Sequence, residues 1–206
     1  MAESASFPQI ILASASPTRQ RLLTAAGIPF KAVAACVDET VIRETLTADG
    51  AEVDPADMAE VLARAKAEDV SARHPGSIVI GADQVLSCGS ELFTKPGTMD
   101  RARDALLALR GRAHQLHTAA VIAEDGETEW VHVDTADLWM RNFSPAFVGR
   151  YLAKVGGDVL GSVGAYQIEG PGIQLFERIE GDYFAILGLP MLPLLKELRA
   201  RKAIPD

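Results

Sequence analysis

Short apolar runs alternate along this chain with longer segments that open on a helix-capping residue, and this alternation restricts the fold more than any other feature. Ile10 to Ala13 and Ile78 to Ile80 are apolar runs bounded by polar residues or glycine, a pattern typical of buried strands. Three helix starts pair a capping side chain with a proline in the first turn, at Ser16-Pro17, Asp54-Pro55 and Ser144-Pro145. Strands mixed with helices predict an α/β or mixed α+β protein.

Glycine, proline and capping residues place the other boundaries. Further strands are expected over 31–37, 113–123, 128–141 and 173–187, with a hairpin across 88–90 and a turn at 125–126. Helices are expected from 17 to Gly27, from 55 to His74, from Thr98 to Gly111, from 145 to Gly156 and after Pro190. Residues 38–54 are acidic and are expected to form an irregular surface loop.

Length and charge narrow the function. A chain of 206 residues with 48% apolar residues predicts one domain, 1–206, with a core that needs no disulfides. The 20 basic and 28 acidic residues give a net charge of −8, which argues against a nucleic-acid partner. A small phosphorylated ligand is still allowed, since a few cations suffice to bind it.

The expected location is the cytoplasm. Cys36 and Cys88 are the two cysteines, and they are expected to be small core residues of a protein in a reducing compartment. The N-terminus has no basic region of the kind that begins a secretory signal. The apolar stretch 183–195 contains two prolines and is too short to cross a bilayer, so no membrane partner is expected.

The segment SASPTR, residues 14–19, is the first candidate for binding. Ser14 and Ser16 precede a helix N-terminus, where free N–H groups and the helix dipole favour an anion. Arg19 adds a full positive charge in the first turn. The same residues also suit an ordinary Ser-Pro helix cap.

Acidic residues after two expected strands are candidates for a metal site. Asp38 and Glu39 follow one of them, and Asp83 follows the apolar run and a Gly-Ala pair. Their oxygens suit a divalent cation that keeps several waters, and the carboxyl ends of strands are where open α/β sheets bind ligands. Solvated loop carboxylates and a turn-capping Asp83 are the alternatives.

The candidate cations are Lys66 and Lys95. Lys66 lies between alanines beside the apolar stripe of its helix and is expected to face inward, although a snorkelling lysine fits as well. Lys95 precedes Pro96, in a segment biased towards extended geometry. His114 and His117 are not expected to form a metal pair, because residues i and i+3 of a strand point to opposite faces.

Taken in order, these motifs resemble the Maf family of nucleotide pyrophosphatases, also called septum-formation inhibitor homologues. The matching segments are LASASPTRQRLLTAAGIPF, VDET, LARAKAED, VIGADQV, TKP, GAYQIEG and GDYFAILGLP, from about residue 10 to residue 198. The ordered set is highly specific. It implies an elongated mixed sheet flanked by helices, with two lobes around a cleft, as in the inosine-triphosphate pyrophosphatases.

The resemblance also implies an activity and residue roles. The family hydrolyses nucleoside triphosphates, including modified ones, to monophosphate and diphosphate with a divalent cation, Mg²⁺ or Mn²⁺. Asp83 matches the general base and a metal ligand, and Glu39 matches an acidic residue near the metal. The phosphate-binding set is matched by Ser14, Ser16, Arg19, Lys66 and Lys95. A homodimer is common in the family.

Three positions bear on the nucleotide base. Gln84 and Glu169 resemble the branch of the family that prefers 7-methyl-GTP over dTTP and UTP. Guanine offers two neighbouring donors, and an ionised carboxylate such as that of Glu169 only accepts. Thr18 departs from the pattern, since the family commonly has a second arginine there.

Two kinds of function remain on the sequence alone. The first is a house-cleaning hydrolase that removes non-canonical nucleotides, with a possible link to cell division. The alternative is a non-catalytic, nucleotide-sensing regulator of septum formation. Asp83, Glu39, Lys66 and Lys95 together favour the hydrolase, because a pure sensor has no need of a carboxylate base.

Overall fold

The computed structural model describes residues 7–50 and 52–205 of the chain. Within these ranges it has seven strands: β1 (Ile10–Leu12), β2 (Lys31–Ala32), β3 (Ile78–Cys88), β4 (Glu91–Phe93), β5 (Ala113–Glu124), β6 (Glu127–Met140) and β7 (Phe176–Glu180). Its helices are α1 (Pro17–Ala25), α2 (Glu39–Leu46), α3 (Pro55–Ala72), α4 (Met99–Leu109), α5 (Pro145–Val155), α6 (Tyr183–Ile186) and α7 (Met191–Ala200). Short 3₁₀ turns cover Ala48–Gly50, Gly156–Gly161 and Pro171–Leu175.

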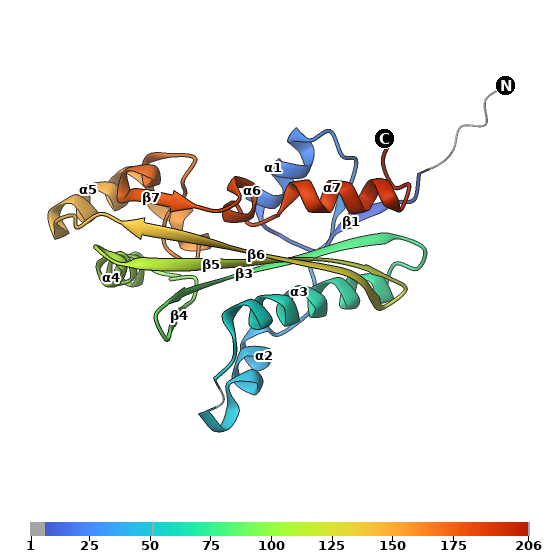
Figure 1. Ribbon diagram of the computed structural model, residues 1–206, viewed down its shortest axis with the longest axis horizontal. Coiled ribbons are helices and arrows are strands. Elements are labelled where there is room, and N and C mark those ends of the chain that lie inside the picture. Colours follow the sequence, from blue (N-terminus) through green and yellow to red (C-terminus); the bar gives the residue numbers. More distant parts are fainter. Residues whose placement is uncertain (1–6, 51, 206) are drawn as a thin grey trace.

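All seven strands form one mixed sheet in the order β2-β1-β3-β5-β6-β7, with β4 paired to β3. β1 runs parallel to both β2 and β3, and the other pairs are antiparallel. The mixed α/β architecture predicted from the alternating pattern is therefore confirmed. The long antiparallel strands β3, β5 and β6 make the molecule elongated (Figure 1).

Helices cover both faces of the sheet. Figure 1 shows α1, α6 and α7 on one side of the long strands and α3, with α2 beyond it, on the other. α4 and α5 lie towards the end of the molecule away from the N-terminus (Figure 1). The expected cleft between two lobes, and the single-domain organisation over 1–206, stay predictions.

The hydrophobic core follows this division. Leu22, Ile80 and Leu194 belong to the cluster between the sheet and α1 and α7. Met58, Leu62 and Val121 belong to the cluster between the sheet and α3. Because successive side chains of a strand point to opposite faces, β3 contributes even-numbered residues to the first cluster and Val85 to the second.

The prediction of an irregular loop over 38–54 was wrong for its first half. Asp38 caps a helix, its carboxylate accepting hydrogen bonds from the backbone N–H groups of Thr40 and Val41. Ile42 and Leu46, one turn apart, then pack against the cluster under α3. The acidic composition suggested a loop, although Asp38 is a suitable N-cap and Ile42 and Leu46 follow it at helical spacing.

Two expected strands are shorter than predicted. The segment 31–37 pairs with the sheet only over β2, because β1 beside it is only three residues long. Cys36 consequently lies at the surface and not in the core, whereas Cys88 is buried. The segment 173–187 forms a 3₁₀ turn, β7 and α6, since Asp182 caps a new helical turn at Ala185.

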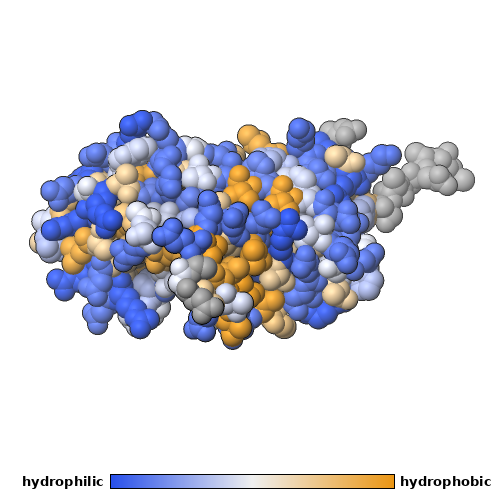
Figure 2. All heavy atoms as spheres, turned by 60° about the horizontal axis from the view of Figure 1, so that its bottom comes forward, coloured by the Kyte–Doolittle hydropathy of each residue, from blue (hydrophilic) through white to orange (hydrophobic). Residues whose placement is uncertain are grey.

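Hydrophobic side chains also reach the surface on the side of α2 and α3. Figure 2 shows them gathered at the middle of this face, between hydrophilic ends. Val41 on α2 and Val61 on α3 are among the exposed ones. None of the helices described for this chain combines the length and hydrophobicity that a membrane span requires.

Candidate active site

Strand β3 carries Asp83 and helix α3 carries Lys66, and their packing brings these two candidate residues together. The Asp83 side chain points to the face of β3 that α3 covers, two residues after Gly81. A Cβ at Gly81 would lie 2.4 Å from the Ala63 carbonyl oxygen and 2.8 Å from the Ala67 Cβ. The missing side chain therefore allows α3 to pack directly on the strand, one turn from the point where Lys66 meets Asp83.

Asp83 does not lie at the end of a strand, as the sequence pattern suggested. β3 continues to Cys88, and its second half pairs with β4 and β5. The segment GADQVLSC did not indicate a strand from the sequence, because its polar residues are distributed over both faces of the strand and interrupt the apolar run. Asp83 is consequently a buried residue in the middle of the sheet, 5% exposed.

Lys66 faces inward, as predicted. Its Nζ lies 2.5 Å from Oδ1 of Asp83 and 2.8 Å from Oε1 of Glu39. The side chains of Lys66 and Asp83 are 9% and 7% exposed, whereas that of Glu39 is 41% exposed. One ammonium group thus joins two carboxylates, one buried and one at the surface.

Helix α2 supplies Glu39 from its first residue and Arg43 one turn later. Arg43 Nη2 lies 3.3 Å from Oδ2 of Asp83. Burial opposes ionisation of Glu39, but the hydrogen bond from Lys66 and the charges of Lys66, Lys95 and Arg43 lower its pKa below the ordinary value. Glu39 is therefore a carboxylate at neutral pH.

The SASPTR segment, residues 14–19, caps helix α1 and also supplies the positive charge of Arg19. Ser16 caps α1, and its backbone N–H donates to the Ser14 hydroxyl at 3.2 Å. Arg19 donates from Nη1 to the same hydroxyl at 3.3 Å and from Nε to the Gly188 carbonyl at 2.7 Å. Burial lowers the pKa of the Arg19 guanidinium, and the charges of Asp83 and Glu39 act in the opposite direction. Arg19 therefore belongs to the same charged cluster.

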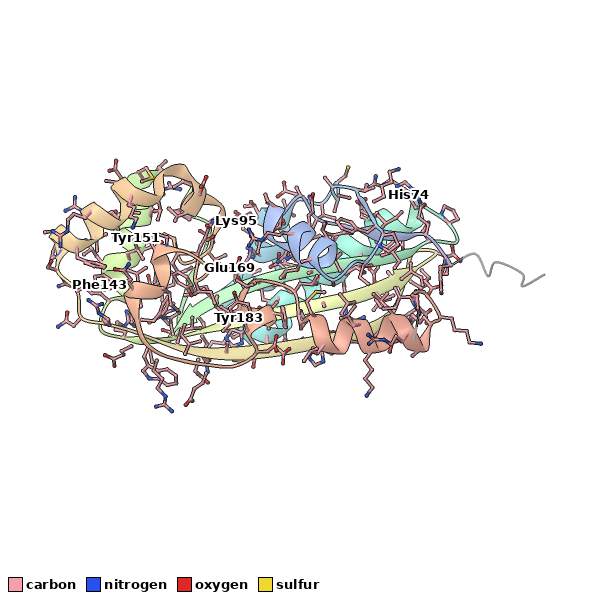
Figure 3. The ribbon with its side chains drawn as sticks, turned by 90° about the horizontal axis from the view of Figure 1, so that it is seen from above. His74, Lys95, Phe143, Tyr151, Glu169 and Tyr183 are labelled. Carbon is pink, nitrogen blue, oxygen red and sulfur yellow. The ribbon has the colours of Figure 1, made fainter. Side chains whose placement is uncertain are left out.

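Lys95 and Glu169 lie near the middle of the elongated molecule, beside α1 (Figure 3). Lys95 is exposed, and its charge helps to lower the pKa of Glu39. Glu169 forms an ion pair with Arg21 of α1, across 148 positions of sequence. Thr18 is half-buried one turn before Arg21 on the same helix.

Gln84 points away from Asp83, to the opposite face of β3. Its amide nitrogen donates to Thr118 Oγ1 at 2.9 Å and to the carbonyls of Ala185 and Ile186 at 3.0 and 3.2 Å. These contacts assign the amide nitrogen to α6. The amide oxygen of Gln84, which only accepts, forms no hydrogen bond within residues 7–50 and 52–205.

The charged cluster can act on a phosphorylated compound. Arg19, Lys66, Arg43 and Lys95 supply positive charge, and Asp83 and Glu39 supply oxygen ligands or a base. Over the described part of the chain, no three His, Cys, Asp or Glu side chains group as a ready metal cluster. Two carboxylates that share one ammonium suit Mg²⁺ or Mn²⁺, which take one or two carboxylates and fill the remaining positions with water and phosphate.

Arg21 and Arg43 belong to the site but were not predicted from the sequence. Arg43 stands four residues after Glu39, so a helix predicted at Asp38 would have placed both on one face. No local spacing indicates a role for Arg21, because its ion-pair partner Glu169 is distant in sequence.

The two histidines of β5 have different partners. His114 Nε2 contacts the Tyr166 hydroxyl at 2.9 Å, and His117 Nε2 contacts the Ser87 hydroxyl at 3.0 Å. Both rings are buried. The expectation that they point to different surroundings is confirmed, and His117 Nδ1 makes a second contact, with Thr135 Oγ1 at 3.1 Å.

The chain is similar to known proteins over nearly its whole length. Residues 9–201 match the family model described as Maf-like protein. A 7-methyl-GTP pyrophosphatase of Mesorhizobium japonicum is 57% identical over 95% of this chain and 98% of its own length. A protein of the same name from Brucella abortus is 53% identical, and a nucleoside triphosphate pyrophosphatase of Granulibacter bethesdensis is 51% identical, each with the same coverage. A solved dITP/XTP pyrophosphatase from Mycobacterium abscessus is 14% identical over 95% of this chain and 94% of its own, with a TM-score of 0.42.

Proposed function

Because the chain belongs to the Maf-like protein family, we propose that it hydrolyses 7-methyl-GTP to 7-methyl-GMP and diphosphate. One observation carries the proposal: a buried carboxylate, Asp83, is held by Lys66 within a cluster of cations. Such a carboxylate can take a proton from water beside a bound triphosphate. The names of relatives at 51–57% identity support the substrate class.

The cations of the site suit a triphosphate. A nucleoside triphosphate carries a charge of about −4, and this acidic protein binds it only where positive charge is concentrated. Arg19 would contact the phosphates from α1, and Lys95 from the segment before α4. Phosphoryl chemistry depends mainly on such positioning and charge stabilisation.

Glu39 and Asp83 are the residues that would hold a divalent cation, Mg²⁺ or Mn²⁺. Both carboxylates contact Lys66 Nζ, so the two groups lie close together. When bound, the cation neutralises phosphate charge and lowers the pKa of a water molecule. The low pKa of Glu39 keeps one of these ligands ionised at neutral pH.

Asp83 is the residue that would accept the proton of the attacking water. Lys66 orients its Oδ1, and pairing with Ala119 of β5 fixes its backbone. The attacked atom would be the α-phosphorus, since cleavage there releases diphosphate. A positioned general base contributes about 10²- to 10⁴-fold to a rate.

Glu169 and Gln84 are the residues that would read the base. The carboxylate of Glu169 accepts from the N1–H and the amine of guanine, and it attracts the positive charge that 7-methylation adds to the ring. Thymine and uracil present one donor between two carbonyl oxygens, so a carboxylate meets at least one acceptor and is penalised. The fixed amide of Gln84 offers a second acceptor to the same ligand.

The test is diphosphate release from 7-methyl-GTP, GTP, dTTP and UTP, each with Mg²⁺ or Mn²⁺. We expect kcat/KM for 7-methyl-GTP to exceed that for dTTP and UTP by about tenfold, which corresponds to about 1.4 kcal/mol. Chromatography should identify 7-methyl-GMP as the second product.

An Asp83→Asn variant is the matched control against contaminating phosphatases. If the wild type binds these nucleotides without releasing diphosphate, the protein is a sensor and the proposal is wrong. If it hydrolyses dTTP or UTP better than 7-methyl-GTP, the activity stands and the base assignment is wrong.

A further inference from the structure

Both oxygens of the Asp83 carboxylate are engaged by cations. Oδ1 is 2.5 Å from Lys66 Nζ, and Oδ2 is 3.3 Å from Arg43 Nη2. A carboxylate held on both oxygens has fewer lone pairs left for a water proton or a metal ion. The two oxygens offer about four lone-pair sites in all, and opening one of the two contacts frees a further site for the reaction.

The two contacts differ in the support behind them. Lys66 is 9% exposed and comes from α3, a helix of 18 residues that buries eight of them. Arg43 is 23% exposed and comes from α2, in which none of the eight residues is fully buried. The contact of Asp83 with Arg43 is also longer, 3.3 Å, than its contact with Lys66, 2.5 Å. Arg43 is therefore the partner that can leave.

The remaining contact of the Arg43 side chain is weak. Nη1 lies 3.3 Å from the sulfur of Met58, and a thioether is a poor acceptor. No other hydrogen bond joins this guanidinium to residues 7–50 or 52–205 in the structure. Most of its five N–H donors are thus available to a new acceptor.

We propose that Arg43 is an additional triphosphate-binding residue, which rests on Asp83 until the substrate arrives. The inference rests on the proposed function, because it takes a triphosphate as the ligand. Guanidinium groups form bidentate, charge-assisted hydrogen bonds with phosphate. Arg43 is attracted by the phosphates and repelled by any second cation at Glu39 and Asp83, so both parts of a loaded site favour its transfer.

This role predicts opposite effects on two ligands. Removing the charge of Arg43 takes away a phosphate contact and weakens triphosphate binding. The same change frees Oδ2 of Asp83 and removes a positive charge beside it, which strengthens binding of a divalent cation. An arginine that only supported the fold would weaken both.

The experiment compares the wild type with Arg43→Met and Arg43→Lys. Arg64→Met is the matched control, since Arg64 pairs with Glu60 on α3 and is 39% exposed. Calorimetry measures binding of a GTP analogue with a methylene bridge between the α- and β-phosphorus, without metal. Electron paramagnetic resonance measures binding of Mn²⁺ alone.

For Arg43→Met we expect analogue binding to weaken by about tenfold, the size of a lost charge-assisted hydrogen bond. We expect Mn²⁺ binding to tighten by about threefold or more, from the removed repulsion. Arg43→Lys should keep part of the analogue affinity, and Arg64→Met should match the wild type. In turnover of 7-methyl-GTP, KM should rise more than kcat falls.

Three results would overturn the inference. One is unchanged analogue affinity in Arg43→Met, and another is weaker binding of both ligands together with a lower melting temperature. The third is a wild type that does not bind the analogue. Neither binding measurement needs turnover, so a wild type that binds the analogue but releases no diphosphate contradicts the proposed function alone.

Discussion

The candidate site joins two regions of different construction. Lys66 and Asp83, here called the floor, come from an 18-residue helix and an 11-residue strand, and their side chains are 9% and 7% exposed. Glu39 and Glu169, here called the rim, come from a short helix and a loop, and their side chains are 41% and 34% exposed. The floor is held by packing that exists before any ligand arrives, whereas the rim is held mainly by ion pairs.

This difference separates chemistry from recognition. A base has to be positioned to within a fraction of an ångström, which a buried strand achieves. Residues that recognise a ligand are commonly on exposed segments, which are less stable locally. Substitutions in the floor are thus expected to have large effects, and substitutions in the rim smaller and ligand-dependent ones.

The largest expected effect is loss of stability in Lys66→Met. The change leaves the buried Asp83 carboxylate with the longer Arg43 contact, and breaking a buried ion pair costs about 3–5 kcal/mol. Urea denaturation measures it, with the exposed Lys196→Met as control. The double variant Lys66→Met, Asp83→Leu should recover part of the loss. A single variant as stable as the control would show that this buried pair adds nothing to the stability of the floor.

Next in size is loss of turnover in Asp83→Asn. Without the base, kcat should fall by about 10²-fold or more, while nucleotide binding persists because a negative charge facing the phosphates is removed. Steady-state kinetics at fixed metal concentration measure the effect. Unchanged kcat would remove Asp83 from the role of base.

The third prediction concerns His114, which contacts the loop that carries the rim residue Glu169. Burial lowers the pKa of His114, which contacts Tyr166 three residues before Glu169, to about 4. The ordinary value of about 6.5 applies in the unfolded chain. Between these pH values the unfolded state binds a proton that the folded state does not. Stability is therefore complete above pH 6.5 and falls as the pH is lowered towards 4, by at most about 1.4 kcal/mol per unit.

Denaturation of the wild type and His114→Gln at pH 7.5 and pH 5 tests this effect. The wild type should lose about 2 kcal/mol more than the variant over this interval. Equal losses would mean that His114 does not carry the dependence.

The fourth prediction addresses the rim directly, through Glu169→Gln. Glutamine both donates and accepts, so kcat/KM for 7-methyl-GTP relative to UTP should fall by about tenfold with little change in stability. The exposed Glu177→Gln is the matched control. An unchanged ratio would place base recognition elsewhere.

The smallest expected effect is that of Arg21→Ala on stability. Its ion pair with Glu169 joins two exposed side chains, and such pairs contribute about 0–1 kcal/mol. Thermal denaturation should therefore shift little. A loss as large as that of Lys66→Met would contradict the distinction between floor and rim.

Most helices and long strands were predictable because their signals are local. Ser16, Asp54 and Ser144 cap the helices that were expected after them, and the turn at 125–126 joins β5 and β6. The residue pattern indicated Asp83, Glu39, Lys66 and Arg19 as candidates, and the resemblance to the Maf family implied their roles. The structure brings all four into one charged cluster. Metal identity, oligomeric state and cellular location stay predictions.

By itself, the sequence determined the class of fold, the helix starts and the types of residue available for the site, since caps, prolines and apolar spacing act over a few residues. Only the tertiary structure decided that Asp83 lies inside a strand, that Arg43 occupies its second oxygen and that Arg21 pairs with Glu169. These contacts join residues 40 and 148 positions apart. Their geometry depends on how the helices pack on the sheet. One example is the close packing of α3 on β3, which the absence of a side chain at Gly81 allows. A pattern of neighbouring residues does not encode contacts between residues so far apart in the sequence.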